Sequence, residues 1–189
     1  MEKKKGQIFI ITGPSGVGKT EILKIILINS ELNLQKVTTC TTRAKRDGEI
    51  DGKDYFFISK EEFLQELKNN EFFEHAEVYG NYYGSRKRDV EKLLNSGKNV
   101  LFQIDPQGAA NLKKINDHCK VIFIKAENID ELKNRLLSRN LDSDADIAKR
   151  LSVAQEEIDN SSQFDYTVIN YTGKIGEAVR DIEKIIKNS

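Results

Sequence analysis

The sequence is poor in the residues that build disulfide frameworks and metal centres. Its 189 residues include only two cysteines, Cys40 and Cys119, and two histidines. Two cysteines are too few for a disulfide framework, and this pair lacks the spacing of metal ligands. We therefore expect two reduced thiols, and the absence of a Cys/His cluster argues against a protein-bound zinc.

An excess of charge of one sign and a long apolar run are also missing. Thirty Lys and Arg residues balance thirty Asp and Glu residues, so a nucleic-acid partner would need a local basic patch. The first residues, "MEKKKGQ", are followed by only six apolar-rich positions, too few for a signal-peptide core or a membrane span. These absences predict a soluble cytoplasmic protein that binds neither membranes nor nucleic acids, and they leave its oligomeric state open.

Proline is scarce as well, with only Pro14 and Pro106, so element boundaries must come from hydrophobic patterning. Apolar, strand-like runs alternate with helical patterns, which predicts one α/β domain with a parallel sheet flanked by helices. The expected buried strands are 8–12, 34–39, 99–104, 120–125 and 165–170. The expected helices are about 20–30, 86–96, 107–115, 129–138, 144–160 and 174–187.

Two stretches interrupt this alternation. Residues 40–84 contain "DYFFI", a short helical pattern "SKEEFLQELKNN" and the aromatic, hairpin-like "FFEHAEVYGNYYG", which together predict an inserted α+β subdomain over the carboxyl edge of the sheet. Residues 138–150, "SRNLDSDADIAKR", are polar and charged, as in a mobile lid.

The stretch "GPSGVGKT" fits the pattern G-x-x-x-x-G-K-[ST]. The glycines let successive backbone N–H groups point inward, Lys19 adds positive charge near the outer phosphates, and Thr20 offers a hydroxyl to Mg²⁺. The loop also lies between an expected strand and an expected helix, as a phosphate loop must. We therefore expect a nucleoside triphosphate site made by Gly13, Pro14, Ser15, Gly16, Val17, Gly18, Lys19 and Thr20.

A second phosphate site is suggested by "TTRAKRDGEIDGKDYFF", in which Arg43 and Arg46 precede Tyr55. Two guanidinium groups and a phenol are suited to clamping a phosphate, because Arg offers paired donors. On this loop alone, two solvated arginines are an equal alternative.

A candidate base-reading group follows in "EFFEHAEVYGNYYGSR", which contains Glu74, Tyr83 and Ser85. A buried carboxylate can accept from two adjacent N–H groups, the pattern on the Watson–Crick edge of guanine and not of adenine. By itself, a surface carboxylate is the simpler interpretation of Glu74.

These motifs, with "IDPQG" and the arginine-bearing lid, resemble the guanylate kinase family in order and spacing from about residue 7 to 187. The resemblance implies a P-loop nucleoside monophosphate kinase fold over residues 1–189. Its core would be about 1–39, 85–137 and 151–189, with a GMP-binding insertion at 40–84 and a lid at 138–150. It also implies transfer of the γ-phosphate of ATP to GMP, and to dGMP, with Mg²⁺, for purine nucleotide supply.

The resemblance also implies a role for each matching residue. At the guanine base it places Thr39, Glu74 and Ser85. At the GMP phosphate it places Arg43, Arg46, Tyr55 and Tyr83. For the donor it implies Lys19 and Thr20, with Asp105 and Thr20 at the metal and Arg135 at ATP. The groups implied to act on the transferring phosphate are Lys19, Arg43, Arg139 and Arg150.

One departure and two alternatives remain. Gln103 stands where the family usually has an aspartate, which puts the strength of the guanine and arginine contacts in question. Some guanylate kinase-like domains of scaffolding proteins bind phosphorylated peptides instead of reacting, but the intact phosphate loop, and the absence of SH3-like or PDZ-like segments, argue against this. A P-loop GTPase lacks support because no N-K-x-D stretch is found.

Overall fold

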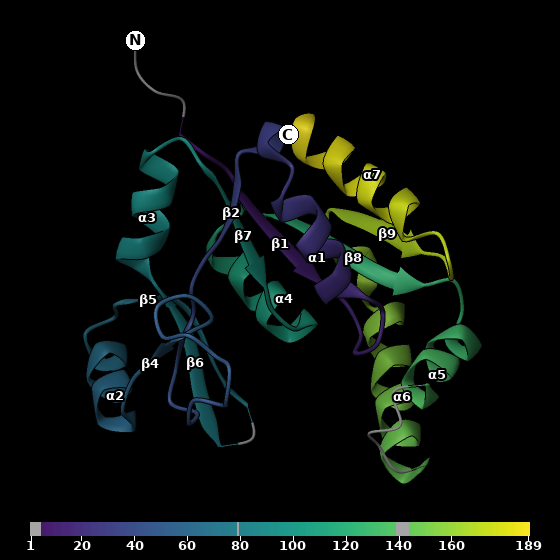
Figure 1. Cartoon of the computed structure of the whole chain (residues 1–189), viewed down its shortest axis with the longest axis horizontal. Coiled ribbons are helices and arrows are strands. Elements are labelled where there is room, and N and C mark those ends of the chain that lie inside the picture. Colours follow the sequence, from purple (N-terminus) through teal and green to yellow (C-terminus); the bar gives the residue numbers. More distant parts are fainter. Residues whose placement is uncertain (1–4, 79, 139–143) are drawn as a thin grey trace. The chain divides into compact units, whose positions relative to one another are not determined.

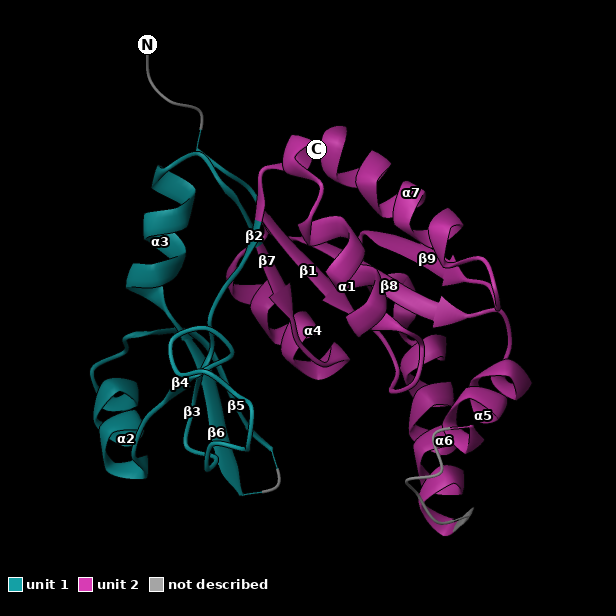
Figure 2. Cartoon of the chain, in the orientation of Figure 1, with its two compact units in different colours: residues 1–7, 35–100 teal, residues 8–34, 101–189 magenta. Residues whose placement is uncertain are grey.

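The structure is a computed structural model that describes residues 5–78, 80–138 and 144–189 (Figure 1). The chain divides into two compact units (Figure 2). Unit 1 holds residues 1–7 and 35–100, and unit 2 holds residues 8–34 and 101–189. Each unit carries its own cluster of buried side chains.

Unit 2 is built on parallel strands. β1 (Ile8–Thr12), β8 (Lys120–Ala126) and β9 (Tyr166–Asn170) pair in parallel, with Ile11 opposite Ile122 and Ile124 opposite Val168. Over the described residues, the larger sheet has the order β2-β7-β1-β8-β9, in which β2 is Leu34–Lys36 and β7 is Asn99–Gln103. Parallel neighbours need crossover connections, and helices supply them.

The helices of unit 2 are α1 (Lys19–Leu27), α4 (Pro106–Ile115), α5 (Ile129–Leu137), α6 (Asp144–Asp159) and α7 (Ile175–Lys187). Short 3₁₀ turns lie at Ser30–Leu32 and Ser161–Gln163. α1 and α7 pack against each other, whereas α4 packs against β1 and β8 (Figure 1).

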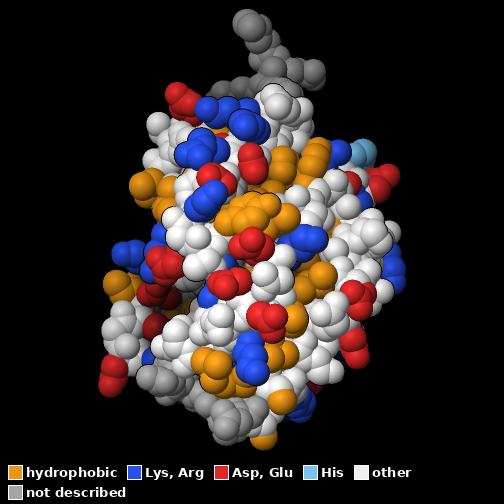
Figure 3. Space-filling model, turned by 90° about the vertical axis from the view of Figure 1, so that its right-hand side faces the viewer, with side chains coloured by type: hydrophobic (Ala, Val, Ile, Leu, Met, Phe, Trp, Pro, Cys, Tyr) orange, Lys and Arg blue, Asp and Glu red, His pale blue; other side chains and the backbone are white. Residues whose placement is uncertain are grey.

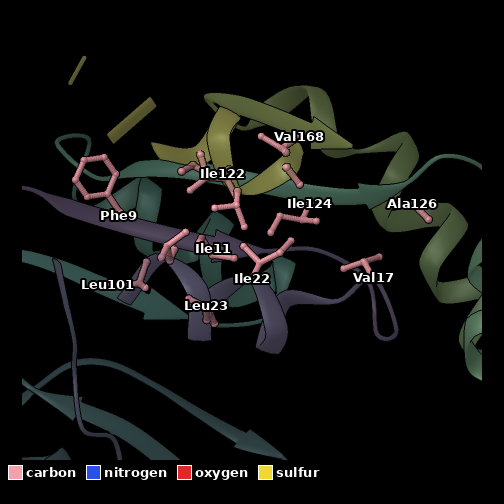
Figure 4. Close-up of a cluster of buried hydrophobic side chains, with 14 of the residues drawn as sticks. Phe9, Ile11, Val17, Ile22, Leu23, Leu101, Ile122, Ile124, Ala126 and Val168 are labelled. Carbon is pink, nitrogen blue, oxygen red and sulfur yellow. The ribbon is translucent and has the colours of Figure 1, made fainter. Parts of the chain in front are cut away.

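The core explains the uninterrupted apolar sequence of β1. Phe9 and Ile11 belong to one buried cluster with Ile22 of α1 and residues of α7 (Figure 4). Ile8 and Ile10 alternate with them and are also buried, because successive side chains of a strand point to opposite faces. A strand buried on both faces needs apolar residues at every position.

Polar residues of unit 2 gather where its strands end. β1 runs directly into the loop 13–20, β9 ends at Asn170, and Asp105 follows β7. The Asp105 carboxylate caps α4 by accepting from the Gly108 N–H at 2.8 Å, with Pro106 in the first turn. The carboxyl ends of parallel strands are where ligands bind in α/β sheets.

Unit 1 has a smaller sheet in the order β4-β3-β6-β5 over the described residues. Its elements are β3 (Cys40–Thr41), β4 (Phe56–Phe57), α2 (Lys60–Lys68), β5 (Phe72–Val78), β6 (Asn81–Arg86) and α3 (Lys87–Asn95). Phe63 of α2 stacks on Phe72 and Tyr82, with ring centroids 4.3 and 5.3 Å away. β5 and β6 form the antiparallel hairpin that the sequence predicts.

Most expected elements of the sheet and its helices are confirmed within one or two residues, but the prediction of a buried strand at 34–39 is wrong. β2 ends at Lys36, and Gln35 and Lys36 are exposed. β2 is an edge strand, so it pairs on one side only and does not need a fully apolar sequence. The helix expected at 20–30 ends at Leu27, because Asn29 caps a separate 3₁₀ turn through the Glu31 N–H.

Candidate active site

The loop 13–20 has the backbone of a phosphate cradle. Gly13 and Gly18 adopt φ angles of 135° and 92°, a region that side chains disfavour. A Cβ on Gly13 would lie 2.0 Å from the Ile124 carbonyl oxygen, and one on Gly18 would lie 2.6 Å from the Asn170 amide nitrogen. Both positions therefore require glycine for conformation and for space, and the loop leads into the N-terminus of α1, which favours anions.

Lys19, the first residue of α1, is held against the loop. Its Nζ donates to the carbonyl oxygens of Gly13 at 2.6 Å and Pro14 at 2.8 Å. Thr20 and Ser15 are exposed. The ammonium group is thus held against the backbone of the loop, where a P-loop lysine meets the phosphates.

Val17 and Asn170 anchor the loop to the core of unit 2. The Val17 side chain is fully buried in the main cluster (Figure 4), and its carbonyl oxygen accepts from Asn170 Nδ2 at 2.8 Å. Asn170 is itself buried. The sequence interpretation missed this residue, although a polar side chain at the carboxyl end of a strand was a signal for it.

Arg135 of α5 binds the same region. Its Nη2 donates to the Asn170 carbonyl oxygen at 2.7 Å and to Thr172 Oγ1 at 3.0 Å. The Thr172 hydroxyl in turn donates to Glu131 at 2.6 Å. In this structure Arg135 joins α5 to the segment after β9, and its implied contact with ATP stays a prediction.

The residues expected in the lid are partly described. Arg139 lies outside the described residues, while Arg150 of α6 donates from Nη1 to Ser15 Oγ at 3.2 Å. Asp105 is exposed at the start of α4, and Gln103 is half-buried at the end of β7. The structure therefore brings Arg150 to the loop, and residues 144–150 form the beginning of α6.

In unit 1, Arg43 is already paired. Its Nη2 donates to Glu49 Oε1 at 2.7 Å, and Nη1 donates to the Ala44 carbonyl oxygen at 2.7 Å. Glu49 Oε2 also accepts from the Arg46 backbone N–H at 2.8 Å. The hydrogen bond from Arg43, followed by that from Arg46, lowers the pKa of Glu49 below its ordinary value. One carboxylate thus organises the whole arginine loop, and sequence reasoning missed it.

The two tyrosines of the expected phosphate clamp lie beside Arg43. The Tyr55 and Tyr83 rings are 6.1 Å apart, edge to face, and the Arg43 guanidinium lies 5.5 Å from the Tyr55 ring centroid. Desolvation by burial raises the pKa of Tyr55, so its hydroxyl stays protonated and can donate. The structure therefore gathers Arg43, Tyr55 and Tyr83, as the clamp requires, while the Arg46 side chain is exposed in the same loop.

Glu74 and Ser85 meet across the hairpin. They are register partners on β5 and β6, and the Ser85 hydroxyl donates to Glu74 Oε1 at 2.7 Å. Ser85 is fully buried and Glu74 is half-buried. Thr39 is also half-buried, and its carbonyl oxygen accepts from the Phe56 N–H at 2.9 Å. A half-buried carboxylate held by a hydroxyl is more than a solvated surface group.

The cysteines, the grouping of possible metal ligands and the surface charges can also be described. Both cysteines are free and buried, and desolvation raises the pKa of each thiol to about 12. Within the described ranges, no three or more His, Cys, Asp or Glu side chains are grouped to hold a metal ion, and none of the helices searched there is long and apolar enough to cross a membrane. On the face drawn in Figure 3, basic and acidic side chains are interspersed.

A parallel sheet that runs into a glycine-rich loop, with its lysine at a helix N-terminus, defines the class of P-loop nucleotide-binding proteins. The guanylate kinase family model matches residues 5–189. A guanylate kinase of Clostridium tetani is 42% identical, with 97% of this chain and 86% of the relative covered. One of Fusobacterium nucleatum is 40% identical, with 97% of both covered.

The solved structures agree. The crystal structure of guanylate kinase from Anaplasma phagocytophilum matches with a TM-score of 0.73 and 34% identity, over 100% of this chain and 88% of that one. The chain therefore belongs to the guanylate kinase family, and it is an enzyme of the kinase class whose reaction is ATP:GMP phosphotransfer.

Proposed function

We propose that the residues described above divide this reaction between the two units. In unit 2, the loop 13–20 with Lys19 holds the ATP phosphates, and Arg150 adds positive charge from α6. In unit 1, Glu74 with Ser85 reads guanine, and Arg43 with Tyr55 and Tyr83 clamps the GMP phosphate. Phosphoryl transfer needs positioning and charge neutralisation more than covalent help from the protein.

The acceptor site discriminates by charge and hydrogen bonding. A carboxylate at Glu74 presents only acceptors, which match the adjacent N–H donors of guanine and mismatch the edge of adenine. The Ser85 hydroxyl fixes one carboxylate oxygen at 2.7 Å, so the other oxygen is directed rather than free to rotate. A site built on such pairing rejects bases that leave its polar groups unpaired.

The residues also fit a magnesium ion that arrives with ATP. Mg²⁺ prefers oxygen ligands, keeps several waters, and is usually held by one or two protein groups plus phosphates. The Thr20 hydroxyl and the Asp105 carboxylate are exposed oxygen donors of unit 2, and Asp105 is oriented by its hydrogen bond from Gly108. The ion would neutralise charge on the transferring phosphate.

The observation that carries the acceptor assignment is the hydrogen-bonded pair of Glu74 and Ser85. This pair lies on the same sheet as Tyr83, which is part of the expected phosphate clamp. A coupled assay with ATP and each of GMP, AMP, UMP and CMP tests it. We expect transfer to GMP and little transfer to the other three. Comparable transfer to AMP would overturn the assignment of Glu74.

A cytoplasmic location stays a prediction.

A further inference from the structure

One face of α6 borders the phosphate loop. Arg150, Ala154 and Glu157 are spaced four and three residues apart, which places them on one side of a helix. Arg150 reaches Ser15 of the loop at 3.2 Å, and Ala154 is 2% exposed. Glu157, one turn further along this face, is half-buried, whereas its neighbour Glu156 is exposed.

Glu157 belongs to a cluster of three charges. Desolvation by burial raises the pKa of Glu157, the Lys19 ammonium lowers it, and the Asp105 carboxylate raises it. All three residues lie in unit 2, and Lys19 begins α1 while Asp105 caps α4. Glu157 thus lies, half-buried, on the face of α6 whose Arg150 reaches the loop, and its carboxyl interacts electrostatically with Lys19 and Asp105.

A carboxylate at such a place disfavours a bare polyphosphate. Metal-free ATP carries about four negative charges and magnesium-bound ATP about two, so a nearby negative charge repels the first more strongly. Partial burial strengthens that difference, because the interaction is less screened by solvent and salt. A carboxylate can also accept hydrogen bonds from waters that Mg²⁺ retains.

We propose that Glu157 is a positioning residue of the donor site which, with Asp105, makes the phosphate loop select magnesium-bound ATP over metal-free ATP. This rests on the proposed donor site at residues 13–20. Glu157 acts through the charge it places beside Lys19, and it need not touch the transferring phosphate.

The test is equilibrium binding of a fluorescent ATP analogue, with excess Mg²⁺ or with EDTA, to the full chain. Glu157→Gln keeps the size of the side chain and removes its charge. We expect the binding of metal-free ATP to tighten more than the binding of magnesium-bound ATP. The dissociation constant of metal-free ATP divided by that of magnesium-bound ATP should therefore fall about tenfold. Glu156→Gln is the matched control and should leave this ratio unchanged.

Two further variants separate charge from structure. Glu157→Asp keeps the charge and should retain most of the preference for magnesium-bound ATP. Glu157→Ser removes the charge and shortens the side chain, and it should lose this preference. An unchanged ratio in Glu157→Gln, or equal weakening of both forms, would overturn the inference. If the wild-type chain binds neither form of ATP, the donor-site assignment itself fails. Transfer of phosphate from ATP to GMP by the wild type shows that ATP does bind, and so separates failure of the donor site from failure of the inference.

Discussion

The two phosphate sites proposed above, one in each unit, are built in different ways. In unit 2 the site is mainly backbone: a glycine-dependent loop anchored by Val17 in a large aliphatic cluster. In unit 1 it is mainly side chain: Arg43 paired with Glu49, and tyrosine rings around them. The buried cluster around Phe63 is correspondingly small and aromatic. A site built from backbone tolerates few substitutions of its glycines, whereas the affinity of a site built from side chains can be changed by substituting one residue at a time.

The largest expected effect is in the backbone-built site. Lys19→Ala should lower kcat by about a thousandfold, or about 4 kcal/mol, because it removes the charge at the donor phosphates. GMP binding should change little, since unit 1 has its own clamp. Steady-state kinetics and GMP titration measure both.

Lys24→Ala is the control for that variant, because Lys24 lies on the same helix and pairs only with the exposed Glu21 among the contacts seen. Turnover above a tenth of the wild-type value in folded Lys19→Ala would contradict the donor assignment.

The second prediction concerns the smaller core. Phe63→Ala should lower the free energy of unfolding by about 3 kcal/mol, because Phe63 is fully buried and stacks on two rings. Denaturant unfolding measures the loss, and hydrogen exchange should show it concentrated in unit 1. Leu64→Ala, at the exposed neighbouring residue, is the control. A loss below about 1 kcal/mol in Phe63→Ala would mean that the side chains around Phe63 repack.

The third prediction tests base reading. Glu74→Gln should reduce kcat/KM for GMP by a factor that corresponds to roughly 2 kcal/mol of transition-state stabilisation, because the amide places a donor opposite a donor of guanine. Acceptor kinetics at saturating ATP measure the change. Glu77→Gln is matched on the same strand, where Glu77 is exposed. GMP kinetics unaffected by the Glu74 variant would make Glu74 a structural partner of Ser85 only.

The smallest effect is expected at Glu49. Glu49→Gln should raise the KM for GMP about fivefold, because a charge-assisted hydrogen bond that orients Arg43 becomes a neutral one. The exposed Asp47 in the same loop provides the control Asp47→Asn. A KM within error of the wild-type value would mean that Arg43 does not depend on this carboxylate.

The pH dependence of the pair follows from the sign of the shift. The pKa of Glu49 is held below its ordinary value, so the contribution of the pair is present above that ordinary value and is lost as pH falls through the lowered one. The KM for GMP should therefore show no step from Glu49 near neutral pH. A step there that Glu49→Gln abolishes would mean that the pKa of Glu49 is raised and not lowered, which would contradict its pairing with Arg43.

Features carried by contiguous residues could be read from the sequence. The phosphate loop was found because its chemistry depends on one short stretch, in which glycines, lysine and threonine act through nearby backbone groups. The strands of unit 2 were found because burial on both faces leaves an uninterrupted apolar run, as in β1. The edge strand β2 was misjudged because apolar runs do not reveal whether a strand has one neighbour or two.

The pattern of residues alone therefore predicts the loop 13–20, the alternation of strands and helices, and the family that the motifs resemble. Three contacts come from the folded chain and not from that pattern, namely Glu49 with Arg43, Ser85 with Glu74, and Asn170 with Val17 of the loop. The physical reason is that these contacts join residues brought together by turns, strand register and helix packing. Pairing of that kind depends on distance and burial, which no local pattern of residue types encodes.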